Sequence, residues 1–129
     1  MSSPIDDARA ANTAFYAAFE KLDADAMARV WSRQPPLLCI HPGWETLLGA
    51  DEVMASWAAI FRNTAYMEIE FEEVAADGDD RVAWFHGVER VRQAGQAGQA
   101  RGEVLATNVF RREAEGWRMV AHHASPAPR

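Results

Sequence analysis

The 129-residue chain predicts a single α+β domain, in which a curved antiparallel sheet wraps over three N-terminal helices. Two features of the sequence predict this class. In the first half of the chain, apolar residues recur at steps of three and four, as in helices that bury one face. From residue 66 onward apolar and polar residues alternate loosely, as in strands, and β-branched and aromatic residues become frequent. The chain is long enough for one core, so we expect one domain over residues 1–129.

Capping residues predict where the helices begin. Ser3 is expected to cap the first helix, since Pro4 suits the first helical position and Asp6 places a negative charge in the first turn. Asp23 is expected to cap a shorter second helix, which ends before two consecutive prolines. The third helix follows Gly49 and carries its apolar residues on one face. These are Val53, Trp57, Ile60 and Phe61.

The sheet is expected to hold one short strand and four longer ones. The acidic turn at 77–80 separates the two strands of a hairpin. The segment 93–100 repeats Gln-Ala-Gly and is expected to be a polar loop, because it offers nothing to bury. The predicted strands are 37–40, 66–76, 82–91, 104–110 and 117–124.

Composition and charge disfavour several classes of partner. The chain has 13 Lys and Arg against 19 Asp and Glu and no basic stripe, so nucleic-acid binding is disfavoured. No apolar stretch approaches the ~20 residues of a membrane helix, and residues 2–7 lack the features of a signal peptide. Cys39 is the only cysteine and cannot form an internal disulfide, which suits a reducing compartment. We therefore expect a cytoplasmic protein that binds neither membranes nor nucleic acids.

Several short segments resemble a known superfamily. They are His41-Pro42-Gly43-Trp44, Gly49, the helix 53–61, Asn108-Val109-Phe110-Arg111, the segment 116–120 and the segment 122–126. In this order they are similar to the SnoaL-like, nuclear transport factor 2-like superfamily. Its members include ketosteroid isomerases, polyketide cyclases, dehydratases and kinase association domains. The resemblance implies a cone-shaped fold with a cavity between the helices and the concave side of the sheet.

The resemblance also implies which strand residues face this cavity. Asn108 points inward, so alternation along the strand turns Ala106 and Phe110 inward as well. On the neighbouring strands the inward residues are Trp84, His86, Val88, Val120, His122 and Ala124. The convex face then carries an apolar patch of Phe85, Leu105, Val109, Trp117 and Met119. Family members dimerise through this face, so we expect a homodimer.

Two candidate catalytic residues match positions of the ketosteroid isomerases. His41 precedes Pro42, where those enzymes place a base Asp, and a neutral imidazole accepts a proton near neutral pH. Asn108 matches their oxyanion donor, and its amide donates without any pKa shift. The second donor of those enzymes, a Tyr, falls at Phe15, with Tyr16 one residue further along. The isomerase set is therefore incomplete. The alternative for His41 is to cap a turn or to hydrogen-bond the backbone beside Pro42, and the alternative for Asn108 is to satisfy backbone or neighbouring side-chain groups in a polar core.

His86 and His122 are the other two candidate catalytic residues, as proton shuttles or as groups that orient the ligand. Kinase association domains carry Arg at the positions of His86 and Asn108, so the imidazoles here favour acidic ligands only when protonated. The alternative for each is a hydrogen-bonded place in a polar core. Convergence of His41, His86 and His122 on zinc is disfavoured, because the chain lacks His-x-His spacing. We expect no metal and no cofactor.

Aromatic side chains are expected to line the cavity and to bind a mostly hydrophobic small molecule. The candidate ligand-binding residues are Tyr16, Trp44, Trp57, Phe61 and Trp84. Their alternative role is to fill the core. The predicted function is a small-molecule enzyme of the isomerase, cyclase or dehydratase kind, which transfers protons in the cavity. The alternative function is a non-catalytic module that binds a ligand or dimerises.

Overall fold

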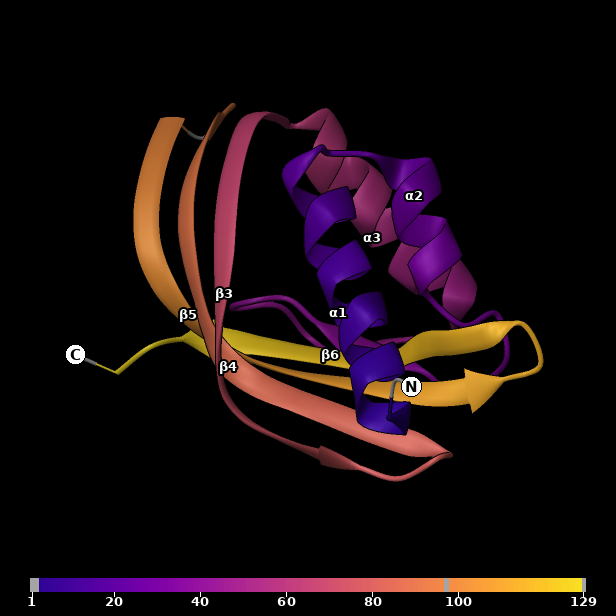
Figure 1. Ribbon diagram of the computed structural model, residues 1–129. Coiled ribbons are helices and arrows are strands. Elements are labelled where there is room, and N and C mark those ends of the chain that lie inside the picture. Colours follow the sequence, from indigo (N-terminus) through magenta and orange to yellow (C-terminus); the bar gives the residue numbers. More distant parts are fainter. Residues whose placement is uncertain (1–2, 97, 129) are drawn as a thin grey trace.

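The computed structural model describes residues 3–96 and 98–128. Within these residues, three helices lie against the concave face of a curved sheet of six strands (Figure 1). The helices are α1 (Pro4–Glu20), α2 (Ala24–Val30) and α3 (Ala50–Arg62). The predicted α+β class, with three helices ahead of the long strands, is confirmed. None of these helices has the length and apolar character needed to cross a membrane.

The helices begin at the predicted capping residues. Ser3 Oγ accepts a hydrogen bond of 3.2 Å from the backbone N–H of Asp6, whose carboxylate accepts one from the backbone N–H of Ser3. Asp23 caps α2 by accepting a hydrogen bond of 3.0 Å from the backbone N–H of Ala26. These bonds satisfy N–H groups that the first turn of a helix otherwise leaves unpaired. Both predicted N-caps are confirmed.

The sheet contains two short strands and four long ones within the described residues. They are β1 (Leu38–Ile40), β2 (Leu47–Leu48), β3 (Thr64–Gly78), β4 (Val82–Gly95), β5 (Gly98–Glu113) and β6 (Gly116–Pro126). Their spatial order is β2-β1-β6-β5-β4-β3. Neighbouring strands are antiparallel except β1 and β6, which run parallel. The sheet is therefore mixed, whereas the sequence predicts a purely antiparallel one.

Residues 93–95 and 98–100 of the Gly-rich segment lie in strands, whereas the sequence predicts a polar loop over 93–100. Gln93 pairs with Ala100 and Gly95 pairs with Gly98, so β4 and β5 continue as one long hairpin. The backbone hydrogen bonds of a hairpin do not require buried side chains. The absence of apolar residues in this segment therefore does not exclude strand pairing. Gly95 also approaches the carbonyl of Asn63 so closely that a side chain has no room. The outer part of this hairpin, residues 90–96 and 98–103, is called the hairpin arm. It therefore passes next to the end of α3.

Aromatic rings of α1 and α3 form the centre of the core. Phe15 and Phe19 both contact Trp57 edge to face, with ring centroids 5.6 and 4.9 Å apart. Trp57 in turn lies 5.6 Å from Phe61. Aromatic pairs of this kind add about 0.5–1.5 kcal/mol to the free energy gained by burying their area. The apolar face predicted for α3 is thus the face that packs on α1 in the core.

On β4 the structure reverses the predicted faces. Directly paired residues of antiparallel strands share a face of the sheet, and Phe85 pairs with Asn108. Phe85 is fully buried on the concave face, whereas Trp84, His86 and Val88 lie on the convex face. A shift of one residue moves every side chain of a strand to the other face, and the register implied by the resemblance is off by one. The predicted cavity positions of Trp84 and His86 are therefore wrong.

A β-bulge reverses part of β6 as well. Val109 and Phe110 are consecutive on β5, but their partners on β6 are Ala121 and Met119. Val120 is therefore the additional residue of the bulge, and strict alternation fails at this point. His122 follows the bulge and faces the helices as predicted, with 1% of its surface exposed.

The apolar patch predicted on the convex face loses three of its members. Phe85, Trp117 and Met119 lie in the core, because the register of β4 and the bulge of β6 turn them toward the helices. A different apolar row crosses the convex face through paired residues of five strands. This convex apolar row consists of Trp84, Val109, Ala121, Leu38 and Leu48.

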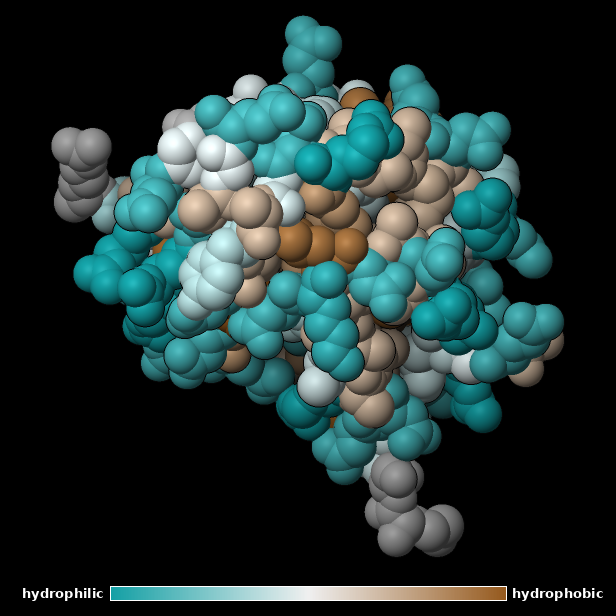
Figure 2. Space-filling view, turned by 90° about the horizontal axis from the view of Figure 1, so that it is seen from above, coloured by the Kyte–Doolittle hydropathy of each residue, from teal (hydrophilic) through white to brown (hydrophobic). Residues whose placement is uncertain are grey.

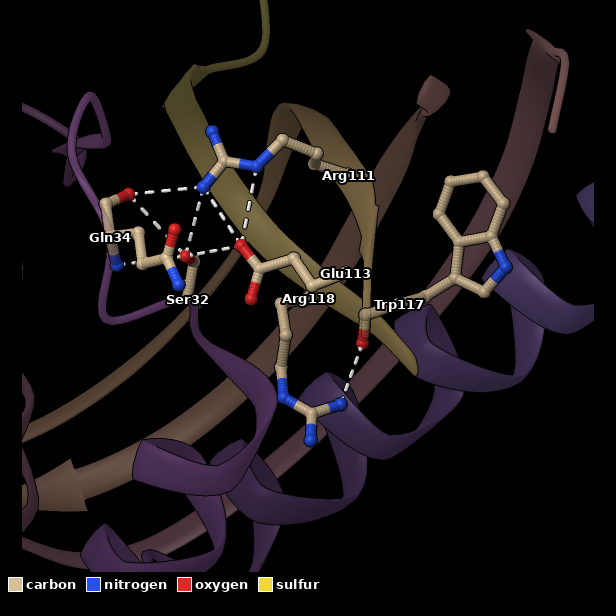
Figure 3. A network of polar contacts seen from close by, with 6 residues as sticks. All are labelled: Ser32, Gln34, Arg111, Glu113, Trp117 and Arg118. Atoms are coloured by element: carbon tan, nitrogen blue, oxygen red, sulfur yellow. Dashed lines mark hydrogen bonds and ion pairs between the residues drawn. The ribbon is translucent and has the colours of Figure 1, made fainter. Parts of the chain in front are cut away.

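A polar network fixes the loop that leads from α2 to β1 (Figure 3). The buried Ser32 donates a hydrogen bond of 2.6 Å to Glu113 and accepts one of 3.0 Å from the backbone N–H of Gln34. Arg111 donates to Glu113 at 2.8 Å and to the carbonyl of Gln34 at 3.0 Å. The loop is thereby tied to the end of β5, and the backbone N–H of Ser32 also donates to the carbonyl of Met119 on β6 at 2.9 Å.

Candidate functional site

A cavity of about 360 Å³ lies between the ends of α1 and α3 and the concave side of the long strands. Phe19 and Ile60 form its apolar wall on the helix side, and Val91 lies on the strand side. From the end of the molecule that carries the hairpin tip, apolar surface is visible inside a hydrophilic surround (Figure 2). Three buried titratable side chains reach this space. They are His41, Glu89 and His122.

A larger hollow of about 810 Å³ lies next to the hairpin arm. Several of its charged side chains are paired, as Arg90 is with Glu72 and Glu103, and Arg92 with Glu68. These side chains are half-exposed, and solvated ion pairs of this kind contribute little to stability or binding. We therefore place the candidate site in the smaller cavity, which holds the buried titratable groups.

His41 follows β1 directly and is held by α3. Its Nε2 lies 2.9 Å from Ser56 Oγ, and Ser56 donates its hydroxyl hydrogen to the carbonyl of Val53 at 2.7 Å. Ser56 therefore accepts from His41, which places the ring hydrogen on Nε2 and leaves a lone pair on Nδ1, with Cys39 Sγ 4.0 Å away. Burial lowers the pKa of His41 to about 4. The imidazole is neutral at pH 7.

His122 is held by a chain of hydrogen bonds that begins at Asn108. The amide nitrogen of Asn108 donates to Asn12 Oδ1 and to the Tyr16 hydroxyl oxygen, each at 2.9 Å. Its Oδ1 lies 2.6 Å from His122 Nδ1 and so accepts from it. The ring hydrogen of His122 is therefore on Nδ1, and Nε2 has the free lone pair. Burial, with a smaller effect of His41 and His123, lowers the pKa of His122 to about 3.

Glu89 ends the same chain. Tyr16 donates its hydroxyl hydrogen to Glu89 Oε2 at 2.7 Å. Burial raises the pKa of Glu89 to about 7, although the hydrogen bond from Tyr16 acts in the opposite direction. Burial and the neighbouring carboxyl group raise the pKa of Tyr16 well above its ordinary value. Near neutral pH the cavity therefore contains one carboxyl group that can give or take a proton.

The predicted site residues divide into two groups by position. His41, His122 and Trp44 line the cavity. Tyr16, Trp57, Phe61 and Asn108 lie behind its wall, where each is less than a tenth exposed. Both hydrogens of the Asn108 amide are already used, so the predicted role of an oxyanion donor is wrong for this geometry. Asn108 orients His122 and Tyr16 instead.

His86 and Trp84 do not belong to the cavity, since both lie on the convex face. His86 Nδ1 lies 2.8 Å from Thr107 Oγ1, which is its partner across the sheet. Convergence of His41, His86 and His122 on a metal is excluded by this placement. Within residues 3–96 and 98–128, no three His, Cys, Asp or Glu side chains are grouped as a metal ion requires.

Glu89 is the residue that sequence reasoning missed. It lies four residues after Phe85, so the correct register of β4 turns both toward the cavity. The sequence around it, Val88-Glu89-Arg90-Val91, resembles an ordinary half-exposed strand. Glu89 could be found by starting from Asn108, moving to its partner Phe85 across the sheet and counting every second residue along β4. That count requires the register of the β4–β5 hairpin, which the sequence alone does not give.

Comparison with known proteins relates this fold and cavity to a family. The model of the SnoaL-like domain matches residues 8–129, nearly the whole chain. A candidate dehydratase of the NTF2-like family from Streptomyces avermitilis is 30% identical, with a TM-score of 0.89 over 98% of this chain and 97% of that one. A candidate association domain of calcium/calmodulin-dependent protein kinase type II from Thiobacillus denitrificans is 39% identical, with a TM-score of 0.83 over 93% and 94%.

A relative among the curated proteins is larger than this domain. The F-box protein SKIP8 of Arabidopsis thaliana is 30% identical over 114 residues, which is 88% of this chain. The chain spans about half the length of that protein, 47%. The family match extends from α1 to the last strand and therefore includes every element that forms the cavity. The chain belongs to the SnoaL-like domain family, within the nuclear transport factor 2-like superfamily.

Proposed function

We propose that the protein eliminates water from a small, mostly apolar hydroxy-carbonyl compound bound in the cavity. The observation that carries this proposal is the pairing of an acid with a base in one buried space. Glu89 holds a proton up to about pH 7, whereas His41 is neutral above about pH 4. Environments that push two pKa values apart in this manner assign the acid and the base of a reaction.

The proposed step uses both groups and balances. His41 Nδ1 takes the proton from the carbon next to the carbonyl group, and the electron pair of that C–H bond forms the C=C bond. The C–O bond of the hydroxyl group breaks, and Glu89 gives its proton to the leaving oxygen, which departs as water. The enzyme is left with an imidazolium and a carboxylate.

The proposed step leaves two opposite charges in the cavity, the imidazolium of His41 and the carboxylate of Glu89. A lone imidazolium or a lone carboxylate is costly to bury, but here both charges appear in the same cavity, where the attraction between them offsets part of that cost. The released water can then carry the proton from His41 back to Glu89, which restores the neutral pair. His122 and Tyr16 do not change protonation in this scheme. They hold the ligand and the carboxyl group in place.

Two further observations support the proposal. The S. avermitilis protein, 30% identical over nearly all of both chains, is named as a candidate dehydratase. The cavity also retains a volume of about 360 Å³ with Trp57 and Phe61 already packed behind its wall. That volume accommodates a molecule with one aromatic ring.

The test uses 4-hydroxy-4-phenylbutan-2-one, whose dehydration gives a conjugated enone that absorbs in the near ultraviolet. We expect Glu89→Gln and His41→Asn each to lower the rate by about 10²- to 10⁴-fold. Glu115→Gln and His123→Asn are the matched controls, because both side chains are exposed. The wild-type rate should rise with pH near 4 and fall near 7, as His41 and then Glu89 lose their protons.

A wild-type rate no higher than that of the Glu89→Gln variant would contradict the proposal. It would favour the alternative function, a non-catalytic module that holds a ligand in the same cavity. A rate that is lost in the two exposed controls as well would place the reaction elsewhere.

We also propose that two copies of the chain pair through the convex apolar row. Trp84 and Leu48 of this row are 38% and 61% exposed in the single chain, and a second copy would cover them. The T. denitrificans relative, 39% identical, is named as an association domain. Light scattering should give the mass of a dimer for the wild type and of a monomer for Trp84→Glu. A monomeric wild type would contradict this pairing.

A further inference from the structure

The directions of the hydrogen bonds around the cavity define what a ligand must supply. His41 donates its only ring hydrogen to Ser56, and His122 donates its own to Asn108. The remaining ring nitrogens, Nδ1 of His41 and Nε2 of His122, carry lone pairs. Both imidazoles are neutral at pH 7, because burial lowers their pKa values. At this wall the protein accepts hydrogen bonds.

The polar groups of Asn108 and Tyr16 behind the wall cannot turn a hydrogen-bond donor toward the cavity, because their hydrogens are already used. Asn108 uses both amide hydrogens on Asn12 and Tyr16, and Tyr16 uses its hydroxyl hydrogen on Glu89. A donor turned into the cavity would leave one of these buried acceptors unpaired, which costs about 1–3 kcal/mol. The indole Nε1 of Trp57 is buried without a partner, but Trp57 lies behind the wall and does not line the cavity. Among the buried cavity-lining residues that the structure describes, the protonated carboxyl of Glu89 is the available donor, and the proposed reaction consumes that proton.

Two other polar residues line the cavity only at its mouth. Gln93 and Arg101 belong to the hairpin arm, and both side chains are exposed. Arg101 pairs with Arg92, one position away from the pair of Val91 and Gly102 that faces the cavity. Alternation therefore directs the Arg101 side chain toward the convex face, so it does not neutralise an anion in the buried part.

We infer that the ligand is a neutral hydroxyl compound, whose O–H group donates a hydrogen bond to Nε2 of His122. This inference rests on the proposed function, since it names the substrate class of the same cavity. In the elimination, the leaving hydroxyl donates to His122 while its oxygen takes the proton of Glu89. A carboxylate ligand would instead face lone pairs and a carboxyl group.

The test compares three one-ring probes of similar shape: phenol, anisole and benzoate. Phenol has the donor hydrogen, anisole replaces it with a methyl group, and benzoate is an anion. We expect phenol to bind the wild-type protein at least about tenfold more tightly than anisole, and benzoate to bind more weakly than either at pH 8. Binding is measured by ligand-detected NMR and by isothermal titration calorimetry.

Two readouts locate the interaction. In ¹⁵N spectra, the Nε2 resonance of His122 should move with phenol and stay in place with anisole. Gly102→Leu should abolish binding of all three probes, because a side chain at Gly102 meets nothing within 4 Å and would extend into the cavity. This variant alters no polar atom of the site. Ala55→Leu is the control, because Ala55 is exposed on α3 and does not line the cavity.

The outcomes separate this inference from the proposed function. Equal binding of phenol and anisole, tighter binding of benzoate, unchanged binding by Gly102→Leu, or no binding of any probe would overturn the inference. A clear preference for phenol in a protein that does not dehydrate the hydroxy-ketone would overturn the proposed reaction alone. Dehydration without that preference would overturn the inference alone.

Discussion

Replacing Glu89 with Gln should change how the stability of the protein depends on pH. Glu89 is 3% exposed, and burial raises its pKa from 4.5 to about 7. The Gln side chain has nearly the same shape, and its oxygen can still accept the hydrogen bond from Tyr16. The variant therefore removes one titrating proton while leaving the packing of the cavity wall in place.

The sign of the effect follows from where the proton is held. Below about pH 4.5, Glu89 is protonated in both states and its contribution is fully present. Between pH 4.5 and 7 the unfolded chain has lost this proton while the native state keeps it, so stability falls as pH rises. Above about pH 7 the contribution is lost. At ~1.4 kcal/mol per pH unit, the rise in pKa from 4.5 to about 7 corresponds to about 3 kcal/mol.

Comparing the two proteins isolates this contribution from that of the histidines. The lowered pKa values of His41 and His122 act in the opposite direction, so stability rises with pH until about 6.5 in both proteins. The difference in free energy of unfolding between Glu89→Gln and wild type cancels these terms. We expect this difference to shift in favour of the variant by roughly 2.5 kcal/mol between pH 5 and pH 8.5.

Urea unfolding at these two pH values, followed by tryptophan fluorescence, measures the shift. Glu115→Gln is the control, because its side chain is 89% exposed and its difference from wild type should not vary with pH. Parallel pH profiles for wild type and Glu89→Gln would refute the reasoning. They would mean that Glu89 is ionised at pH 5 in the native protein, and the proposed acid would be absent.

Three further predictions follow from other parts of the structure. Gly87→Ala should destabilise the protein by about 3 kcal/mol in urea unfolding, because a Cβ there meets the carbonyl of Glu72 and the ring of Phe71. Its control is Gly102→Ala, which has open space and should cost less than about 1 kcal/mol. Ser32→Ala should cost about 1 kcal/mol, since it removes one hydrogen-bond partner each from the part-buried N–H of Gln34 and the carboxylate of Glu113, while the exposed Thr13→Ala should cost little. Proton-nitrogen spectra at pH 5.5 should show His122 neutral with its hydrogen on Nδ1, and a protonated ring would contradict the assigned tautomer.

The helices could be predicted because their signals are local. Ser3 and Asp23 satisfy backbone N–H groups only a few residues away, so the cap is visible in the sequence itself. The apolar face of α3 likewise follows from spacing within a single helix, and the burial of Trp57 and Phe61 confirms it. The cavity positions of His41 and His122 agree with the prediction, because His41 directly follows β1 and His122 lies on the part of β6 beyond the bulge, where alternation from Ala124 holds.

The faces of β4 and β6 could not be predicted because they depend on pairing between distant strands. Alternation fixes which residues share a face but leaves open which face is buried, and a shift of one residue exchanges the two. On β4 this shift placed His86 and Trp84 in the cavity and hid Glu89. On β6 the bulge at Val120 interrupts alternation, and its sequence carries no Gly or Pro that would indicate it.

The stability cost of burying Glu89 indicates that this residue is needed for the function of the cavity and does not stabilise the fold. Burial raises its pKa, and the hydrogen bond from Tyr16 is the one stabilising contact that opposes this effect among the described residues. A carboxyl group in this position costs stability at neutral pH, whereas Gln or Met of similar size would not. Buried groups with such a cost are concentrated where their protons are used. Tyr16 and Asn108 connect this carboxyl to His122, which lines the same cavity. The stability that Glu89 costs therefore places an acid in the cavity that also contains the proposed base, His41.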